Sequence, residues 1–233
     1  HTRCSRDWSS DVCSSDLLKA VETRLRKKAI LEDTYPAGSG GVNELMKKLE
    51  TAGFLGLNPD LYDSEAHAKK QLIYAEGKRP KNLFFLKSGK VKTFKMHEDG
   101  KEYITNLYSP GDYLGYSALL ENSSYDDTAE VLEDAEVILI PKDDFLQSVY
   151  KDLNIAGKFI RLITHDVKEK ENRLLNLAYD SLRKRVAKAL VEINEKFNKD
   201  RTPQIAISRE DIAQYVGTAT ESLIRTLSDF KSE

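Results

Sequence analysis

Glycines recur at nearly even intervals through the middle of the chain, and this spacing restricts the possible folds more than any other feature of the sequence. They stand at positions 77, 89, 100 and 111. Short strands that repeat about every eight to twelve residues between glycine turns favour an antiparallel sandwich, barrel or jelly roll. Turns at Ser88-Gly89 and Asp99-Gly100 would join successive strands. Six segments qualify as strands: Gln71–Tyr74, Asn82–Leu86, Val91–Met96, Tyr103–Leu107, Thr128–Leu132 and Glu136–Ile140.

The sequence pattern becomes helical after Pro141. Apolar residues recur every three or four positions from Ile155 to Leu177, opposite a charged side, which predicts a long amphipathic helix within 146–178. Its apolar stripe could pack against its own domain or against a second copy of the helix. In a parallel homodimer, four residues would form the seam: Phe159, Ile163, Val167 and Leu174.

Residues 179–233 have the pattern of a helix-turn-helix. Ser208, followed by Asp211, is close to a capping box and opens a helix that Gly217 ends. Apolar residues at 212, 216, 223, 224 and 227 would pack two helices across a short turn. In such a unit, the first side chains of the second helix contact base edges in the major groove of DNA. The candidate DNA-binding residues are Ser208, Thr218, Thr220, Glu221 and Arg225.

Glu221 and Arg225 lie one helical turn apart and have the chemistry to read bases. Glutamate can accept a hydrogen bond from cytosine, and arginine can donate two to guanine. The same spacing is common in solvent-exposed ion pairs, so both interpretations stay open on spacing alone. Charge does not decide between them, because 179–233 contains ten Lys or Arg and nine Asp or Glu. A local basic cluster is either a phosphate-facing patch or a solvated helix face: Arg183, Lys184, Arg185 and Lys188.

Composition argues against several other classes of protein. No apolar run reaches the roughly eighteen residues of a membrane helix, so we expect a cytoplasmic protein with no membrane partner. Both cysteines lie within the first 17 residues, which disfavours a disulfide framework, an iron–sulfur cluster and a Cys-ligated zinc site. Of the later histidines, His67, His97 and His165, no two have the spacing of metal ligands. We therefore expect no metal site, no catalytic residues and no enzyme activity.

The N-terminal region has a different character. The letters DWSSDVCSSDL, residues 7–17, resemble the translation of a sequencing adapter, so we expect 1–17 to be an adapter-derived, disordered segment. A helical pattern follows over 18–31. Residues 32–65, which include a Pro- and Gly-containing stretch, are expected to form a linker with short helices.

Four sequence blocks, in this order, resemble the Crp–Fnr family of bacterial regulators. They are GKRPKNLFFLKSGKVKTFK, EDGKEYITNLYSPGDYLGYSALL, NLAYDSLRKRVAKAL and ISREDIAQYVGTATESLIRTLSDFK. The resemblance implies an α+β protein with a cyclic-nucleotide-binding-type antiparallel β jelly roll over 66–145, a dimerisation helix over 146–178 and a helix-turn-helix domain over 179–233. It also implies a sequence-specific transcription regulator that binds double-stranded DNA as a homodimer and contacts RNA polymerase, with Glu221 and Arg225 at base-reading positions.

The resemblance weakens at the effector site. Members of the family that bind cyclic AMP carry a Glu for the ribose hydroxyl and an Arg-Ser pair for the cyclic phosphate, where this chain has Tyr116 and the run Asp126-Asp127-Thr128. Carboxylates would repel a phosphodiester, so we expect no cofactor and no tight binding of a cyclic nucleotide. The effector-pocket candidates are Gly111, Asp112, Gly115, Tyr116, Ser117, Asp127 and Thr128.

Both ends of the chain depart from the family pattern. The segment 18–31 resembles the last helix of a receiver domain, and the family's β wing would follow after Glu233. We therefore expect a fragment of a receiver-fused member whose winged helix-turn-helix is cut short. The alternative function is a cyclic-nucleotide-type regulatory module that acts through protein contacts.

Overall fold

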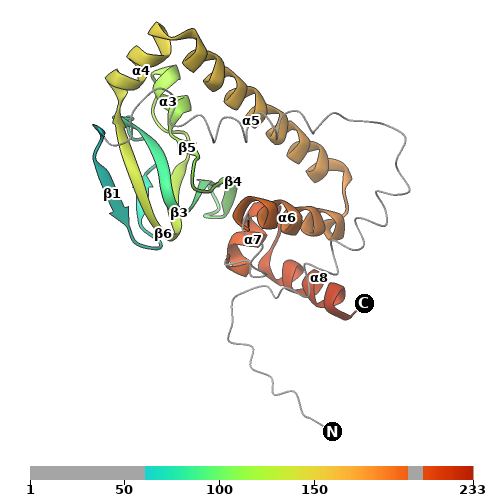
Figure 1. Cartoon of the computed structure of the whole chain (residues 1–233). Coiled ribbons are helices and arrows are strands. Elements are labelled where there is room, and N and C mark those ends of the chain that lie inside the picture. The colour runs from blue at the N-terminus through green and yellow to red at the C-terminus, as the bar shows by residue number, and fades with distance from the viewer. Residues whose placement is uncertain (1–60, 199–206, 233) are drawn as a thin grey trace. The chain divides into compact units, whose positions relative to one another are not determined.

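The computed structural model describes residues 61–198 and 207–232, which belong to two compact units (Figure 1). Among these residues, one unit comprises 61–180 and the other 181–198 and 207–232. The predicted segments 1–17 and 18–31, and most of the predicted linker 32–65, lie outside the described residues. Within the described ranges, no helix combines the length and the apolar character that a membrane crossing requires.

The larger unit is built on one six-stranded antiparallel sheet. Its strands are β1 (Ser64–His67), β2 (Leu72–Tyr74), β3 (Asn82–Met96), β4 (Glu102–Tyr108), β5 (Tyr113–Leu114) and β6 (Thr128–Pro141). β3 and β6 pair along almost their whole length, β1 and β2 also pair with β6, and β4 and β5 pair with β3. The predicted antiparallel jelly-roll type of β domain is confirmed.

The predicted turn at Ser88-Gly89 is wrong. The pair lies inside β3, whose register against β6 shifts on both sides of Ser88, so that the strands predicted on either side are one bent strand. Gly89 has a φ of +89°, and a Cβ there would lie 2.4 Å from the carbonyl oxygen of Asp134. This glycine therefore allows a close approach of two strands. The two strands predicted over 128–140 are likewise one strand, β6.

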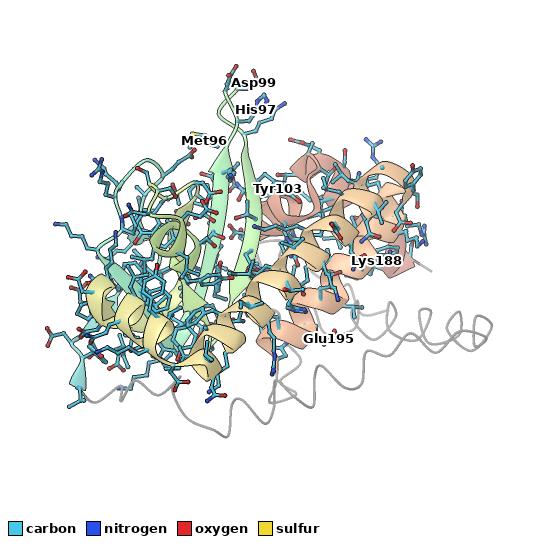
Figure 2. All side chains as sticks on the ribbon, turned by 90° about the horizontal axis from the view of Figure 1, so that it is seen from above. Met96, His97, Asp99, Tyr103, Lys188 and Glu195 are labelled. Carbon is cyan, nitrogen blue, oxygen red and sulfur yellow. The ribbon has the colours of Figure 1, made fainter. Side chains whose placement is uncertain are left out.

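The turn predicted at Asp99-Gly100 is confirmed and joins β3 to β4. The amide of Gly100 donates to the carbonyl of His97 over 2.8 Å, and the amide of His97 donates to the carbonyl of Lys101 over 2.8 Å. Gly100 has a φ of +76°, which glycine adopts without strain. Figure 2 shows Met96, His97 and Asp99 at the tip of this hairpin.

The described part of the larger unit also contains three helices: α3 (Tyr116–Glu121), α4 (Lys142–Lys151) and α5 (Leu153–Tyr179). α3 and α4 lie at one end of the sheet (Figure 1). An apolar cluster joins them to the sheet, and in it the rings of Phe145 and Phe159 are 4.9 Å apart. The predicted helical range 146–178 is divided, because α4 ends before Asp152 and the carboxylate of Asp152 caps α5 by accepting from the amide of Asn154 over 2.8 Å.

The smaller unit contains three described helices: α6 (Leu182–Phe197), α7 (Arg209–Val216) and α8 (Thr220–Ser232). Each is amphipathic, and the apolar sides supply the buried residues of this unit. The largest of these are Val186, Leu190, Ile193, Ile212, Tyr215, Val216, Leu223, Leu227 and Phe230. α7 and α8 are therefore held in a fixed arrangement by a core that α6 shares.

Candidate functional site

The helix-turn-helix consists of α7 and α8, and a serine begins it. The hydroxyl of Ser208 accepts from the amide of Asp211 over 3.0 Å and donates to the carboxylate of the same residue over 2.6 Å. The serine half of the predicted capping box is therefore present, whereas the Asp211 carboxylate accepts from the hydroxyl of Ser208, where the acid of a capping box would accept from its backbone amide. Because this hydroxyl caps its own helix, Ser208 positions α7, and its contact with DNA stays a prediction.

A glycine sets the turn between the two helices. Gly217 has a φ of 71° and a ψ of 51°, and its amide donates to the carbonyl of Ala213. The amide of Thr218 donates to the same carbonyl over 3.0 Å. Glycine adopts this left-handed conformation without a steric penalty, so it ends α7 and lets α8 restart at Thr220.

Glu221 and Arg225 lie on the exposed side of α8. Both side chains are exposed, and they share one face because they are four residues apart. Leu223 and Leu227 are buried on the opposite side. Ile224, which the sequence pattern assigned to the interior, is 36% exposed and so borders the face that carries Glu221 and Arg225.

The basic cluster of α6 is not one uniform patch. Nη1 of Arg185 donates to the carbonyl of Val216 over 3.3 Å, at the C-terminal end of α7. The guanidinium of Arg183 lies 4.9 Å from the centre of the Phe230 ring on α8. These two arginines connect helices within the unit. The phosphate-facing role of the cluster, which includes Lys188 as labelled on α6 in Figure 2, stays a prediction.

The effector-pocket candidates belong to the larger unit. Gly111 and Asp112 form the turn between β4 and β5, where the carboxylate of Asp112 accepts from the amide of Ser109 over 2.8 Å. Gly115, with a φ of +78°, precedes α3, and a Cβ there would lie 3.2 Å from the ring of Tyr125. Ser117 is exposed on α3. Of these residues, Asp112 is close enough to Tyr116 for its charge to help raise the pKa of that tyrosine, after burial and the charge of Asp166.

Tyr116 connects the candidate effector site to α5. Its side chain is buried, and its hydroxyl donates to the carboxylate of Asp166 on α5. Its ring centre lies 5.8 Å from that of Phe159 on the same helix. Burial, followed by the charge of Asp166, raises the pKa of Tyr116, so this hydroxyl remains a donor at neutral pH.

Asp127 accepts hydrogen bonds from hydroxyl groups of its own domain. The donors are the hydroxyl of Tyr74, over 3.1 Å, and the hydroxyl of Thr105, over 3.3 Å. Burial and the charge of Asp126 raise the pKa of Asp127, and the hydroxyl donors oppose this. The sequence analysis missed Tyr74 and Thr105, because they lie on β2 and β4 and only the pairing of the strands brings them to residue 127.

α5 turns one row of residues toward its own β domain. Phe159, Asp166 and Arg173 follow one another at intervals of seven, which is close to two helical turns. Phe159 is 1% exposed in the core, Asp166 accepts from Tyr116, and Nη1 of Arg173 donates to the carbonyl of Thr105 over 3.0 Å. The assignment of Phe159 to a dimer seam is therefore wrong, because its own domain already buries it.

The neighbouring row on α5 is apolar and exposed. The exposed fractions are 63% for Ile160, 37% for Ile163, 49% for Val167, 69% for Leu174 and 49% for Leu177. Ile163, Val167 and Leu174 are three of the four predicted seam residues. The first residue of this exposed row is Ile160. The sequence analysis had assigned the preceding residue, Phe159, to that position of the seam.

Comparison with known proteins agrees with this division of the chain. Residues 65–152 match the family model of the cyclic nucleotide-binding domain, and residues 184–233 match that of the Crp-like helix-turn-helix domain. Both are families of binding modules, which agrees with the expectation that the chain is not an enzyme.

Two similar whole proteins are named as a regulatory protein and as a receptor protein. An anaerobic regulatory protein of Aggregatibacter actinomycetemcomitans is 26% identical over 167 residues, which cover 70% of this chain and 65% of that protein. A cyclic AMP receptor protein of Thermus thermophilus is 26% identical over 187 residues, covering 77% of this chain and 85% of that protein. The chain thus spans just under two thirds of the length of the first relative and more of the second.

Among solved structures, FixK2 of Bradyrhizobium japonicum has the same fold, with a TM-score of 0.65 and 24% identity over 73% of this chain and 85% of that one. The fold, the order of the two domains and the matches to the two family models all point to the same family. A cyclic nucleotide-binding-type β domain followed by a Crp-like helix-turn-helix makes this chain a member of the Crp–Fnr family.

Proposed function

We propose that this protein is a sequence-specific, DNA-binding transcription regulator that acts as a parallel homodimer. The observation that carries the proposal is the exposed pair Glu221 and Arg225 on α8, opposite the residues that pack this helix into its unit. A helix fixed in this way presents both side chains to the floor of a major groove. Such a regulator works in the cytoplasm of a bacterium, where it would also contact RNA polymerase.

The test of base reading is the replacement of Arg225. A guanidinium that binds guanine through two hydrogen bonds contributes about 1–3 kcal/mol of discrimination, so Arg225→Ala should relax the preference at one position of each half-site by that amount. Binding sites would be selected from random DNA with the wild-type protein and compared with the variant. Lys231→Ala, an exposed cation at the other end of α8, is the matched control. If Arg225→Ala lowers the affinity for selected and for random DNA by the same factor, Arg225 contacts the DNA backbone and does not read bases.

The exposed row of α5 supports the homodimer. Five apolar side chains from Ile160 to Leu177 are at least 37% exposed, and the intervals between them are three, four, seven and three residues, which fits the heptad spacing of a coiled coil with position 170 held by lysine. A second copy of α5 would cover them, since the same row recurs on it. Two-fold symmetry would then present two helix-turn-helix units to a palindromic site, with half-sites about one DNA turn apart.

We also infer that cyclic nucleotides do not bind tightly. Asp127 is already engaged by the hydroxyls of Tyr74 and Thr105, and Tyr116 by Asp166. A cyclic phosphate brought to this region would face two carboxylates, those of Asp126 and Asp127, and would displace internal hydrogen bonds. Calorimetric titration with cyclic AMP should give no measurable binding at micromolar concentration. Binding in that range would contradict the inference.

A further inference from the structure

One arginine of α6 contacts the end of α7 that leads into the turn before α8. Nη1 of Arg185 donates to the carbonyl of Val216, the last residue of α7, over 3.3 Å, and Nε of the same side chain is buried. The guanidinium therefore lies at the C-terminal end of a helix, where a positive charge is favourable, and it faces the interior of the unit. Gly217 follows Val216 directly, so Arg185 holds the turn from which α8 starts.

A second arginine of α6 contacts the far end of α8. The guanidinium of Arg183 lies 4.9 Å from the centre of the Phe230 ring, and Phe230 is buried in the last turn of α8, which ends at Ser232. α8 has 13 residues, which corresponds to a length of about 20 Å. Two arginines that are two positions apart on α6 therefore contact the turn before α8 and the final turn of α8.

The candidate base-reading residues Glu221 and Arg225 lie between these two contacts along the chain. Both side chains are exposed, whereas the core beneath α8 is largely apolar. Apolar burial is not directional, so a core alone permits small rotations of a short helix, while a hydrogen bond restricts both distance and angle. A base contact needs the same precision, because its residues must be held by supporting contacts to within about 0.5 Å. The orientation of α8 therefore decides whether Glu221 and Arg225 reach their bases.

We propose that Arg185 is a positioning residue for base reading, and that the contact between Arg183 and Phe230 has the same role at the other end of α8. The inference rests on the proposed DNA-binding function. Arg185 acts through the turn at Gly217 and does not bind a phosphate, although it belongs to a basic cluster. Two of the four cations of that cluster then serve sequence discrimination, and general affinity for DNA is left to the others.

Binding to DNA distinguishes a positioning role of Arg185 from a phosphate contact. Arg185→Met keeps a long apolar stem and removes the donors and the charge. The affinity for a site selected with the wild-type protein, divided by the affinity for random DNA of equal length, should fall by about fivefold or more, the lower bound for one lost base contact. The slope of log affinity against log salt should stay at its wild-type value. A phosphate contact would instead lower both affinities by the same factor and reduce that slope by about one unit.

Lys184→Met is the matched control, because it makes the same replacement at the cation between the two arginines. It should keep the wild-type ratio of the two affinities. Phe230→Leu tests the other end of α8 with a residue that carries no charge. It removes the ring that Arg183 contacts and keeps an apolar side chain, so the ratio should fall while the salt slope stays unchanged.

Circular dichroism at the assay temperature establishes that each variant is folded. If Arg185→Met is not folded, Arg185→Lys replaces it, since lysine keeps the charge but lacks the planar fork of arginine. If Phe230→Leu is not folded, Arg183→Met replaces it and leaves the ring in the core. In either replacement, a ratio below that of the wild type supports the proposal, and the wild-type ratio overturns it.

The proposal is also overturned if Arg185→Met lowers both affinities equally, if Phe230→Leu keeps the wild-type ratio, or if Lys184→Met lowers the ratio as much as Arg185→Met does. The wild-type protein separates this proposal from the one on which it rests. If wild-type protein does not prefer any selected site over random DNA, base reading fails and the positioning role fails with it. If wild-type protein and Arg185→Met prefer the selected site to the same degree, base reading stands and only the positioning role fails.

Discussion

At the scale of single residues, hydroxyl groups determine the chemistry around Asp127. Tyr74 and Thr105 donate to its two carboxylate oxygens, and the hydroxyls of Thr93 and Thr105 are 2.9 Å apart. These donors satisfy the carboxylate, yet burial and the charge of Asp126 outweigh them and raise its pKa. The folded protein therefore binds a proton at Asp127 more tightly than the unfolded chain does. A raised pKa of this kind contributes stability below the pKa of the unfolded chain, and the contribution is lost as the pH rises through the folded pKa.

Asp127→Asn should remove this pH dependence. Asparagine can accept from Tyr74 and donate to Thr105, and it does not ionise. We expect the variant to match the wild type in acid and to gain stability relative to it as the pH rises toward neutrality. The thermal unfolding midpoint, measured across this pH range, is the readout.

Asp126→Asn is the control for that experiment and should have the opposite sign. Lys95 and Lys170 lower the pKa of Asp126, so the ionised carboxylate contributes stability above the pKa of the unfolded chain. The asparagine variant should lose stability relative to the wild type as the pH rises through the acid range. Parallel pH profiles for the two variants would contradict the assignment of opposite shifts.

At the scale of elements, local signals predicted the helix-turn-helix well and long strands poorly. Ser208 and Gly217 mark the two ends of α7, as the sequence predicted. Such signals can be read from the sequence because an N-cap serine and a left-handed glycine interact only with residues a few positions away. Gly89 has the same chemistry in the sequence, yet it lies inside a strand. Its conformation is required by the approach of Asp134, 45 residues later, and no local pattern contains that information.

The same limit applies to α5. Its apolar period predicts a helix, and the observed bounds exceed the predicted Ile155–Leu177 by two residues at each end. The period does not determine which apolar residue faces which partner, because two rows of one helix differ by a single position. Phe159 belongs to the row that the β domain buries, whereas Ile160 is exposed in the next row. Phe159, Asp166 and Arg173 are seven residues apart, and this interval can be read from the sequence. Charged residues such as Asp166 and Arg173 are ordinarily expected to face solvent, and only the structure shows that they bond to Tyr116 and Thr105 of the β domain.

The burial of Lys92 also depends on residues that are distant from it in the sequence. The side chain is 5% exposed, and its Nζ lies 3.3 Å from Glu130 and 3.6 Å from Glu102. These partners lie on β6 and β4, on either side of β3. A buried lysine is stable only when charges of opposite sign are close, and the pairing of three strands supplies them.

At the scale of the whole molecule, the exposed apolar row of α5 connects the proposals about DNA binding and dimerisation, and we call it the seam: Ile160, Ile163, Val167, Leu174 and Leu177. One helix-turn-helix reads a half-site only, and a dimer gains affinity because the second unit binds within the same complex. We expect Leu174→Glu to break the dimer, since it removes an apolar contact and introduces a charge between the helices. A loss of about 2 kcal/mol or more would weaken the dimer roughly thirtyfold.

The adjacent residue provides the control for this prediction. Leu175 is 57% exposed and Leu174 is 69% exposed, so Leu175→Glu makes the same chemical change at similar exposure, but outside the seam. Sedimentation and binding to a selected palindrome would be measured for both variants, with a single half-site as a second DNA. Leu174→Glu should lose affinity for the palindrome and keep its weak binding to the half-site, because α8 is unchanged. Leu175→Glu should behave as the wild type in both measurements. Equal effects of the two variants would mean that this row of α5 is not the dimer contact, and the two helix-turn-helix units would then have to be brought together by another surface.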